Sequence, residues 1–137
     1  MTSLFEYAPA PESRSIVDIR PSYGLFVDGE FDEGTGIPLK TVNPATEEVL
    51  SEVATGSDDD VDRAVRAARR AFTRVWGPMR PADRGKYLFR IARLLQERAR
   101  EFAVLETLDN GKPIRESRDV DVPLAAAHFF YLSLIHI

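Results

Sequence analysis

The sequence predicts an α/β fold in which a β-hairpin region is followed by three amphipathic helices. Glycine-containing turns separate short extended segments over residues 24–54, which is typical of hairpins. From residue 61 onward, apolar residues recur every three or four positions, which is typical of helices with one buried face. Each helix needs a covered apolar face, and so short a β region cannot cover three helices, so we expect this fold to be incomplete.

The β region begins at Gly24. Residues 24–31 predict a strand, a tight turn at Asp28-Gly29 and the start of a second strand. Residues 39–43 are extended, and residues 49–54 alternate in the manner of a strand. Together these segments predict a small β meander or a long hairpin.

The first helix is predicted to begin at Ser57, because the three aspartates that follow it suit the positive end of a helix and its hydroxyl can cap free amides. It ends at Gly77-Pro78. Its apolar face comprises Val61, Ala64, Val65, Ala68, Phe72 and Val75.

The second helix is predicted to open at Pro81, a residue favoured in the first turn. It ends at Asn110-Gly111, with a bend or break over residues 98–101. The third helix is predicted to start near Arg115 and to run through Phe130.

Residues 1–23 are predicted to form an irregular N-terminal arm, since Pro9, Pro11 and Pro21 interrupt any periodic pattern. Ile16, Val17 and Ile19 give this arm a short apolar patch, which we expect to dock on the folded part.

Composition excludes several functions for the chain itself. It contains no cysteine, so a disulfide framework, a thiolate metal site and a cysteine nucleophile are all absent. The formal net charge of −4 gives no basic excess for nucleic acid. Gly34 and Gly36 lack the third glycine of a dinucleotide fingerprint, and the two histidines lack metal-ligand spacing. Without a long apolar run or a secretory signal, we expect no membrane contact and a cytoplasmic location.

Four segments resemble the aldehyde dehydrogenase superfamily. The most specific are residues 41–50 (TVNPATEEVL) and residues 105–113 (LETLDNGKP), and residues 26–30 and 84–98 also match in order and spacing. The resemblance covers residues 24–131 and implies that they are the N-terminal part of a Rossmann-like NAD(P)-binding domain.

The resemblance implies that the intact protein oxidises an aldehyde to a carboxylic acid with NAD or NADP as acceptor, and that it forms a homodimer or homotetramer. In the family a cysteine attacks the aldehyde and a glutamate activates the hydrolytic water, in keeping with covalent catalysis. These groups and the dinucleotide site would all follow the last helix. We therefore assign no catalytic or cofactor-binding residue to this chain, and expect it to be inactive and to bind no cofactor.

One site is implied within the chain. Asp109 lies in the last turn of a predicted helix, where a carboxylate costs about 0.3–1 kcal/mol against the helix dipole, so a positive group should lie beside it. The resemblance implies that Asp109 and the backbone carbonyls of Thr41 and Val42 hold Na⁺ or K⁺. The alternative is that Lys112 or a downstream arginine pairs with Asp109.

Residues 132–137 are expected to be a non-native tail, because LSLIHI looks like the translation of a common transposon-derived sequencing adapter. The alternative is a natural apolar end to the third helix. A second functional hypothesis also stays open, in which the chain is a natural short helical interaction module that binds or modulates full-length dehydrogenase subunits.

Overall fold

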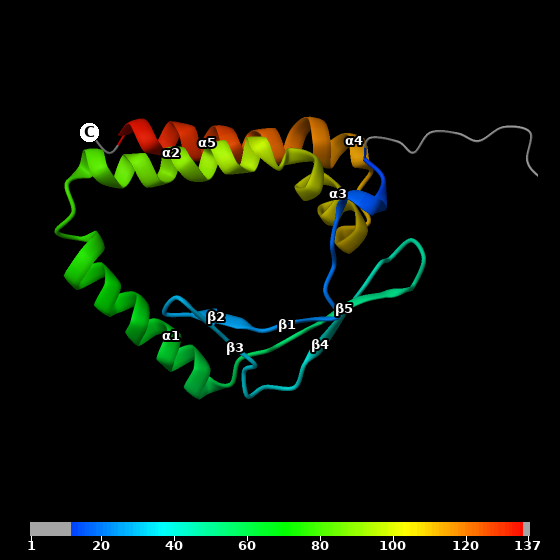
Figure 1. The fold of residues 1–137 in the computed structure, drawn as a ribbon, viewed down its shortest axis with the longest axis horizontal. Helices are drawn as coiled ribbons and strands as arrows, with labels where there is room; N and C mark the ends of the chain where they lie inside the picture. Colours follow the sequence, from blue (N-terminus) through cyan, green and yellow to red (C-terminus); the bar gives the residue numbers. More distant parts are fainter. Residues whose placement is uncertain (1–11, 136–137) are drawn as a thin grey trace, which may run out of the picture.

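A computed structural model describes residues 12–135 of the chain. Helices α2 (Pro81–Glu97) and α5 (Val122–Ile135) lie side by side, and α1 (Asp58–Ala71) runs away from them toward the strands (Figure 1). Helix α3 (Ala99–Asn110) descends from the helical pair toward the strands. This α/β arrangement agrees with the predicted fold class.

The strands form two separate sheets. In the first, β1 (Ser22–Tyr23) pairs in parallel with β5 (Val49–Val53), which pairs antiparallel with β4 (Leu39–Val42). The second is a hairpin of β2 (Leu25–Val27) and β3 (Glu30–Asp32). The prediction of one continuous meander or hairpin is therefore wrong, because the pairing of β1 with β5 joins segments about thirty residues apart and leaves no local signal.

The same pairing corrects the predicted boundary of the arm. Within residues 12–23, a single 3₁₀ turn, η1 (Arg14–Ile16), is followed by strand β1, so the arm is not irregular up to residue 23. The carbonyls of Pro21 and Tyr23 accept hydrogen bonds from the amides of Glu52 and Ala54 at 3.0 and 2.8 Å. Pro21 has no amide hydrogen to donate, yet its carbonyl still joins the sheet. The part of the predicted arm before residue 12 lies outside the described residues.

The hairpin turn has the predicted form. Asp28 and Gly29 adopt φ values of 58° and 89°, which are the positive angles that a two-residue turn of this kind requires. The rings of Phe26 and Phe31 face each other across the two strands, with centroids 4.9 Å apart. Arg70 of α1 reaches Asp28 at 2.9 Å, so the hairpin is held against the helix.

Helix α1 begins where the sequence predicts. The Ser57 hydroxyl accepts a hydrogen bond from the Asp60 amide, and the Asp60 carboxylate accepts one from the Ser57 amide, which completes a capping box. A π-helical turn, η2 (Phe72–Trp76), extends the helix to Gly77, in agreement with the predicted end. Asp60 thus stabilises the first turn of α1.

Asp60 also joins α1 to the loop between β3 and β4. Its carboxylate, 6% exposed, accepts hydrogen bonds from the Thr35 hydroxyl at 2.6 Å and from the Thr35 amide at 3.1 Å. Arg63 bridges Asp60 and Asp32, the last residue of β3. The Thr35 hydroxyl, followed by the Ser57 amide, holds the pKa of Asp60 far below its ordinary value of 3.8. The negative charge is therefore favoured in the folded state.

Helices α2 and α5 approach closely because small residues line their contact. Ala92 and Ala126 are 0% and 2% exposed, and a Cβ added to Gly85 would lie 2.6 Å from the Ser133 carbonyl oxygen. Residues 132–135 continue α5, while residues 136–137, the end of the expected non-native tail, lie outside the described residues.

The second and third predicted helices are confirmed, with local irregularities. The break between α2 and α3 falls at Arg98, inside the predicted range. The third helix starts as a short turn, α4 (Ile114–Glu116), and passes through a π-helical segment, η3 (Ser117–Asp121), into α5. Within residues 12–135, no helix is both long and apolar enough to cross a membrane.

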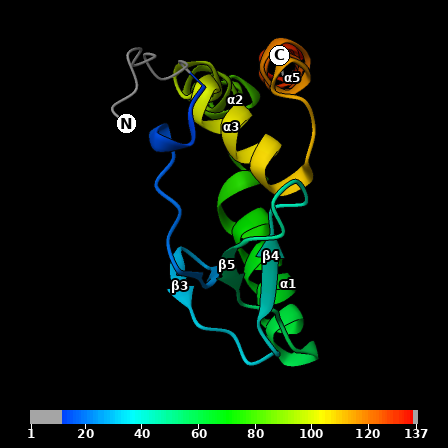
Figure 2. The same cartoon turned by 90° about the vertical axis from the view of Figure 1, so that its right-hand side faces the viewer.

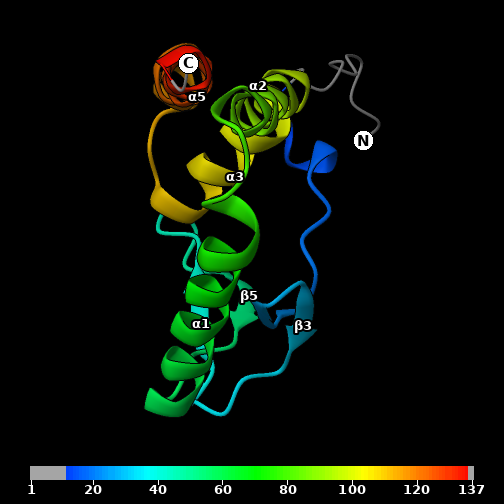
Figure 3. The same cartoon turned by 90° about the vertical axis from the view of Figure 1, so that its left-hand side faces the viewer.

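The buried core consists of small residues. Alanines and valines make up its apolar part, and among the described residues Ser117 is the largest side chain that is fully buried. Large apolar side chains remain exposed on both α2 and α5. Phe89, Leu94 and Tyr131, for example, are 49%, 46% and 64% exposed. Figure 3 shows α2 and α5 end-on, with the strands far below them. The apolar helix faces are thus uncovered, as expected for an incomplete fold.

Glycine at position 111 lets α3 end against the strands. Gly111 adopts the left-handed φ of 78° as the cap of α3, in agreement with the prediction. A Cβ at this position would lie 2.6 Å from Cγ of Pro44, the residue that begins the turn after β4. Figure 2 shows the end of α3 beside this turn. The two most specific sequence motifs therefore meet at one contact.

We predict that Asp60→Asn lowers the stability of α1 at neutral pH and flattens its acid dependence. A depressed folded-state pKa contributes stability above the unfolded value, and that contribution is lost as pH falls below 3.8. Urea unfolding followed by the fluorescence of Trp76, the one tryptophan in the sequence, measures both effects. Asp58→Asn, an exposed residue in the same first turn, is the control. Equal acid dependence in the native and Asp60→Asn chains contradicts the prediction.

We also predict that Gly111→Ala destabilises the chain more than Gly29→Ala. Both alanines must adopt a left-handed conformation, at about 1–2 kcal/mol. The alanine at 111 also collides with Pro44, whereas a Cβ at Gly29 meets no atom within 4 Å. Chemical denaturation of the two variants measures the difference. Equal losses would show that the contact with Pro44 contributes nothing.

Candidate functional site

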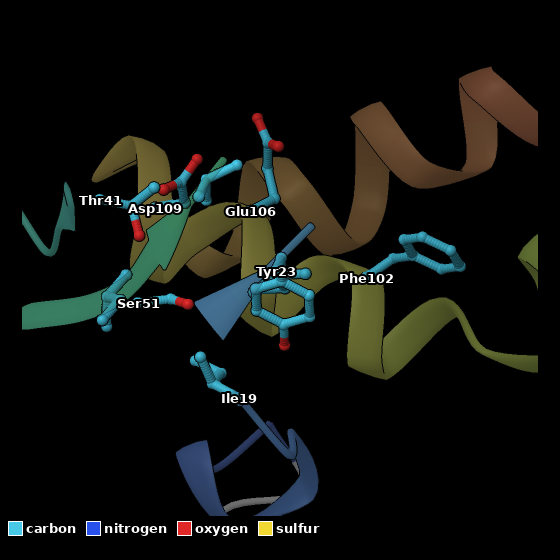
Figure 4. A pocket seen from close by; sticks show the side chains of 10 residues that line it. Ile19, Tyr23, Thr41, Ser51, Phe102, Glu106 and Asp109 are labelled. Carbon is cyan, nitrogen blue, oxygen red and sulfur yellow. The ribbon is translucent and has the colours of Figure 1, made fainter. Parts of the chain in front are cut away.

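A cavity of about 360 Å³ lies where the arm, the three-stranded sheet and α3 meet. The arm supplies Ile19, β1 supplies Tyr23, and α3 supplies Phe102 and Leu105 to its walls. Figure 4 shows Thr41 beside Asp109 at one end, Phe102 at the other, and Glu106 between them with its carboxylate pointing away from Tyr23 and Ser51. The predicted docking of the arm's apolar patch is confirmed, because Ile19 forms part of this wall.

Backbone groups of Arg20 hold the arm to the sheet beside the cavity. The Ser51 hydroxyl, on β5, donates to the Arg20 carbonyl at 2.9 Å, and the Arg20 amide donates to the Tyr23 hydroxyl at 3.0 Å. Ser51 is 5% exposed. The hydroxyls of Ser51 and Tyr23 therefore already have partners in the protein.

The pairing of β4 with β5 is irregular at the predicted site. Thr41 pairs with Ser51 and Val42 with Val49, so Leu50 of β5 is the extra residue of a β-bulge opposite Thr41 and Val42. A bulge interrupts the ladder of backbone hydrogen bonds and changes the direction of neighbouring backbone groups. The side chain of the next residue, Asn43, is buried and accepts a hydrogen bond from the Ala45 amide at 2.9 Å, so β4 ends in a turn capped by this side chain.

Helix α3 brings Asp109 to the same place. Asp109 and Glu106 lie one helical turn apart near the C-terminal end of α3, and both line the cavity with Thr41. The helix dipole makes this end negative, so the two carboxylates add to a negative potential that favours a cation.

The alternative for Asp109 is a salt bridge with Lys112 or a downstream arginine. Among the described residues, Lys112 and Arg118 have other partners. Lys112 pairs with Asp121 of η3, and this contact raises the pKa of the Lys112 amine. Arg118 pairs with Asp119 and Glu12. In the part of the chain that the structure describes, no ion pair involves Asp109, so the charge that its position calls for is not supplied by Lys112.

The donor set at this end of the cavity suits a hard cation of low charge. Within residues 12–135, no three histidine, cysteine, aspartate or glutamate side chains are grouped as a metal site. A cation here would rely on one or two carboxylates supplemented by neutral oxygens from the β4 backbone, and such all-oxygen surroundings suit hard cations. Oxygen donors of this kind are those that the implied Na⁺ or K⁺ would use.

The three predicted site residues are brought together to different degrees. Thr41 and Asp109 line one cavity, although 68 positions separate them in sequence. Val42 follows Thr41 across the bulge, but its side chain is 42% exposed and does not line the cavity. Sequence reasoning missed Glu106, although its spacing of three residues from Asp109 on a helix was a usable signal.

The chain is similar to known proteins of one family. Residues 31–135 match the aldehyde dehydrogenase family. The chain is 45% identical over 109 residues to DhaS of Bacillus subtilis (strain 168), a protein whose name as an aldehyde dehydrogenase is provisional, covering 78% of this chain and 22% of that one. An aldehyde dehydrogenase of Alternaria alternata is 42% identical, with 79% and 22% covered.

A solved structure agrees with these relatives. The NAD⁺ complex of an aldehyde dehydrogenase from Bacillus cereus superimposes with a TM-score of 0.78 and 38% identity, over 82% of this chain and 23% of that chain. The present chain thus spans about a fifth of the length of the relatives it matches. With the family match, the sequence identity and the shared fold in agreement, the chain belongs to the aldehyde dehydrogenase family.

Proposed function

We propose that the intact protein is an NAD(P)-dependent aldehyde dehydrogenase that oxidises an aldehyde to a carboxylic acid. The observation that carries this proposal is the match of residues 31–135 to the family. A related enzyme was solved with NAD⁺, which supports a dinucleotide as the hydride acceptor. We further propose a cytoplasmic homodimer or homotetramer.

In this proposal, residues 24–131 are a structural part of the NAD(P)-binding domain and carry out no chemical step. A cysteine-free chain cannot supply a cysteine nucleophile. The exposed apolar faces of α2 and α5 would be covered in the intact enzyme by segments that the relatives have in addition. Such burial contributes about 25 cal/mol per Å² of apolar surface, so these faces would help to hold the domain together.

We predict that the purified 137-residue chain shows neither NAD- nor NADP-linked oxidation of aldehydes, whereas a gene product that continues past Tyr131 into the family's full length is active. Initial rates of nicotinamide reduction at 340 nm, with a panel of aliphatic and aromatic aldehydes, test both forms. Turnover by the 137-residue chain would refute the structural role, and an inactive, folded full-length product would refute the activity.

The exposed helix faces also favour a second candidate, a short interaction module that binds full-length dehydrogenase subunits. Co-purification of the 137-residue chain with a folded dehydrogenase would support it. Failure of the two to associate at micromolar concentrations would count against it.

We also propose that Asp109, with the backbone carbonyls of Thr41 and Val42, binds Na⁺ or K⁺. The bulge of β5 opposite Thr41 and Val42 and the two carboxylates that line the cavity support this site. The bound ion would connect the end of α3 to the sheet and so reinforce the contact between Gly111 and Pro44.

We predict that Na⁺ or K⁺ stabilises the chain relative to tetramethylammonium at the same ionic strength, by about 1.4 kcal/mol at ten times the dissociation constant. Asp109→Asn should abolish this difference. Glu97→Gln, which removes an exposed carboxylate paired with Arg93 on α2, should leave it intact. Denaturation curves in the three chloride salts provide the measurement, and equal stability in all of them would rule out the site.

A further inference from the structure

One face of α1 is apolar and exposed, and it adjoins the face that contacts the hairpin. The α1 seam comprises Val61, Val65, Ala68 and Phe72, of which the three large side chains are 57%, 58% and 55% exposed. The hairpin lies along the neighbouring side of the helix, where Ala64, Ala67 and Ala71 adjoin it, and the seam residue Ala68 lies at the boundary and lines the same hollow. The periodicity of the sequence predicts that these large side chains form a buried face, but in the structure they are open to solvent.

The spacing within the α1 seam places its four members on one stripe of the helix. Its members are four, three and four residues apart, as at alternating a and d positions of a heptad. The set is also self-complementary in an antiparallel pair, because Val65 of one helix then meets Ala68 of the other, and Val61 meets Phe72. Every position of the seam acquires an apolar partner in this register, and each layer combines a larger with a smaller side chain.

Charges beside the α1 seam select the antiparallel direction. Asp62 and Arg69 follow the seam residues Val61 and Ala68 and lie on the same flank of the helix. The antiparallel register brings Asp62 close to Arg69 of the second copy, and the two-fold symmetry repeats this pair. In a parallel pair, Asp62 would instead lie level with Asp62 of the second copy, and Arg69 with Arg69 of the second copy.

These two charges are available for such contacts. Arg63 and Arg70 of α1 are engaged with Asp32 and Asp28 of the hairpin. Asp62 makes one long pair with Arg66 at 3.7 Å, with both side chains largely exposed, and such a pair contributes little. Within the described residues, Arg69 takes part in no ion pair.

We propose that the α1 seam is a docking surface for a second copy of this chain, which binds as an antiparallel helix pair held in register by Asp62 and Arg69. The proposal concerns the 137-residue chain and does not depend on the enzymatic activity of a longer protein. The π-helical turn at Phe72–Trp76 ends the regular spacing and limits the contact to α1.

Sedimentation equilibrium of the native chain and of charge variants tests the proposal. Asp62→Arg and Arg69→Asp should each raise the dimer dissociation constant about tenfold, since each places like charges together twice in the symmetric pair. The double variant Asp62→Arg with Arg69→Asp should restore the native value. Asp59→Arg, on another side of α1, is the control and should have a smaller effect.

Spin labels give an independent test of direction, because the chain has no cysteine to remove. A label at Arg66→Cys lies near the proposed two-fold axis and should give a short distance between copies. Labels at Asp58→Cys, near the end of the helix, should lie about 25 Å apart in the two copies, as calculated from a rise of 1.5 Å per residue. Equal distances at both positions, a monomeric native chain at millimolar concentration, or a double variant that fails to recover association would overturn the proposal.

Discussion

The end of α3 can approach the strands only because residue 111 carries no side chain. The cavity, the position of Asp109 beside Thr41 at its end and the meeting of the two sequence motifs all depend on this approach. Gly111 satisfies two requirements at once, since it adopts a left-handed conformation and leaves room for the ring of Pro44. A helix terminus thereby becomes part of the wall of a cavity, with Asp109 beside the strand residue Thr41.

A second polar junction fixes the other end of the β region. The Asp60 carboxylate caps α1, binds the loop at Thr35 and shares Arg63 with Asp32. The segment from β3 to α1 is consequently held by hydrogen bonds to one charged group, because few large apolar side chains are buried there. Polar networks of this kind specify geometry well, while most of the stability of a domain comes from apolar burial. The small core thus explains why these few polar contacts carry so much of the architecture.

Membership of the aldehyde dehydrogenase family accounts for this imbalance. A chain that spans about a fifth of its relatives keeps the local structure of its segment, since caps, turns and helix periodicity are local properties. The burial of large side chains is a property of the whole domain, and in this chain many large apolar side chains stay exposed. Exposed side chains on α1, α2 and α5 are then contact surfaces whose occupants decide whether this polypeptide is a monomer, a self-associating species or part of a larger enzyme.

The sequence alone determined the local elements of this protein. The Asp28-Gly29 turn, the cap at Ser57, the break near Arg98 and the end of α3 at Gly111 were all predictable, because each depends on residues close together in the chain. The parallel pairing of β1 with β5, the division into two sheets, the partner of Lys112 and the place of Glu106 beside Asp109 were decided by tertiary structure. These features join residues from distant segments, and contacts between distant segments leave no periodic or capping signal in a single sequence.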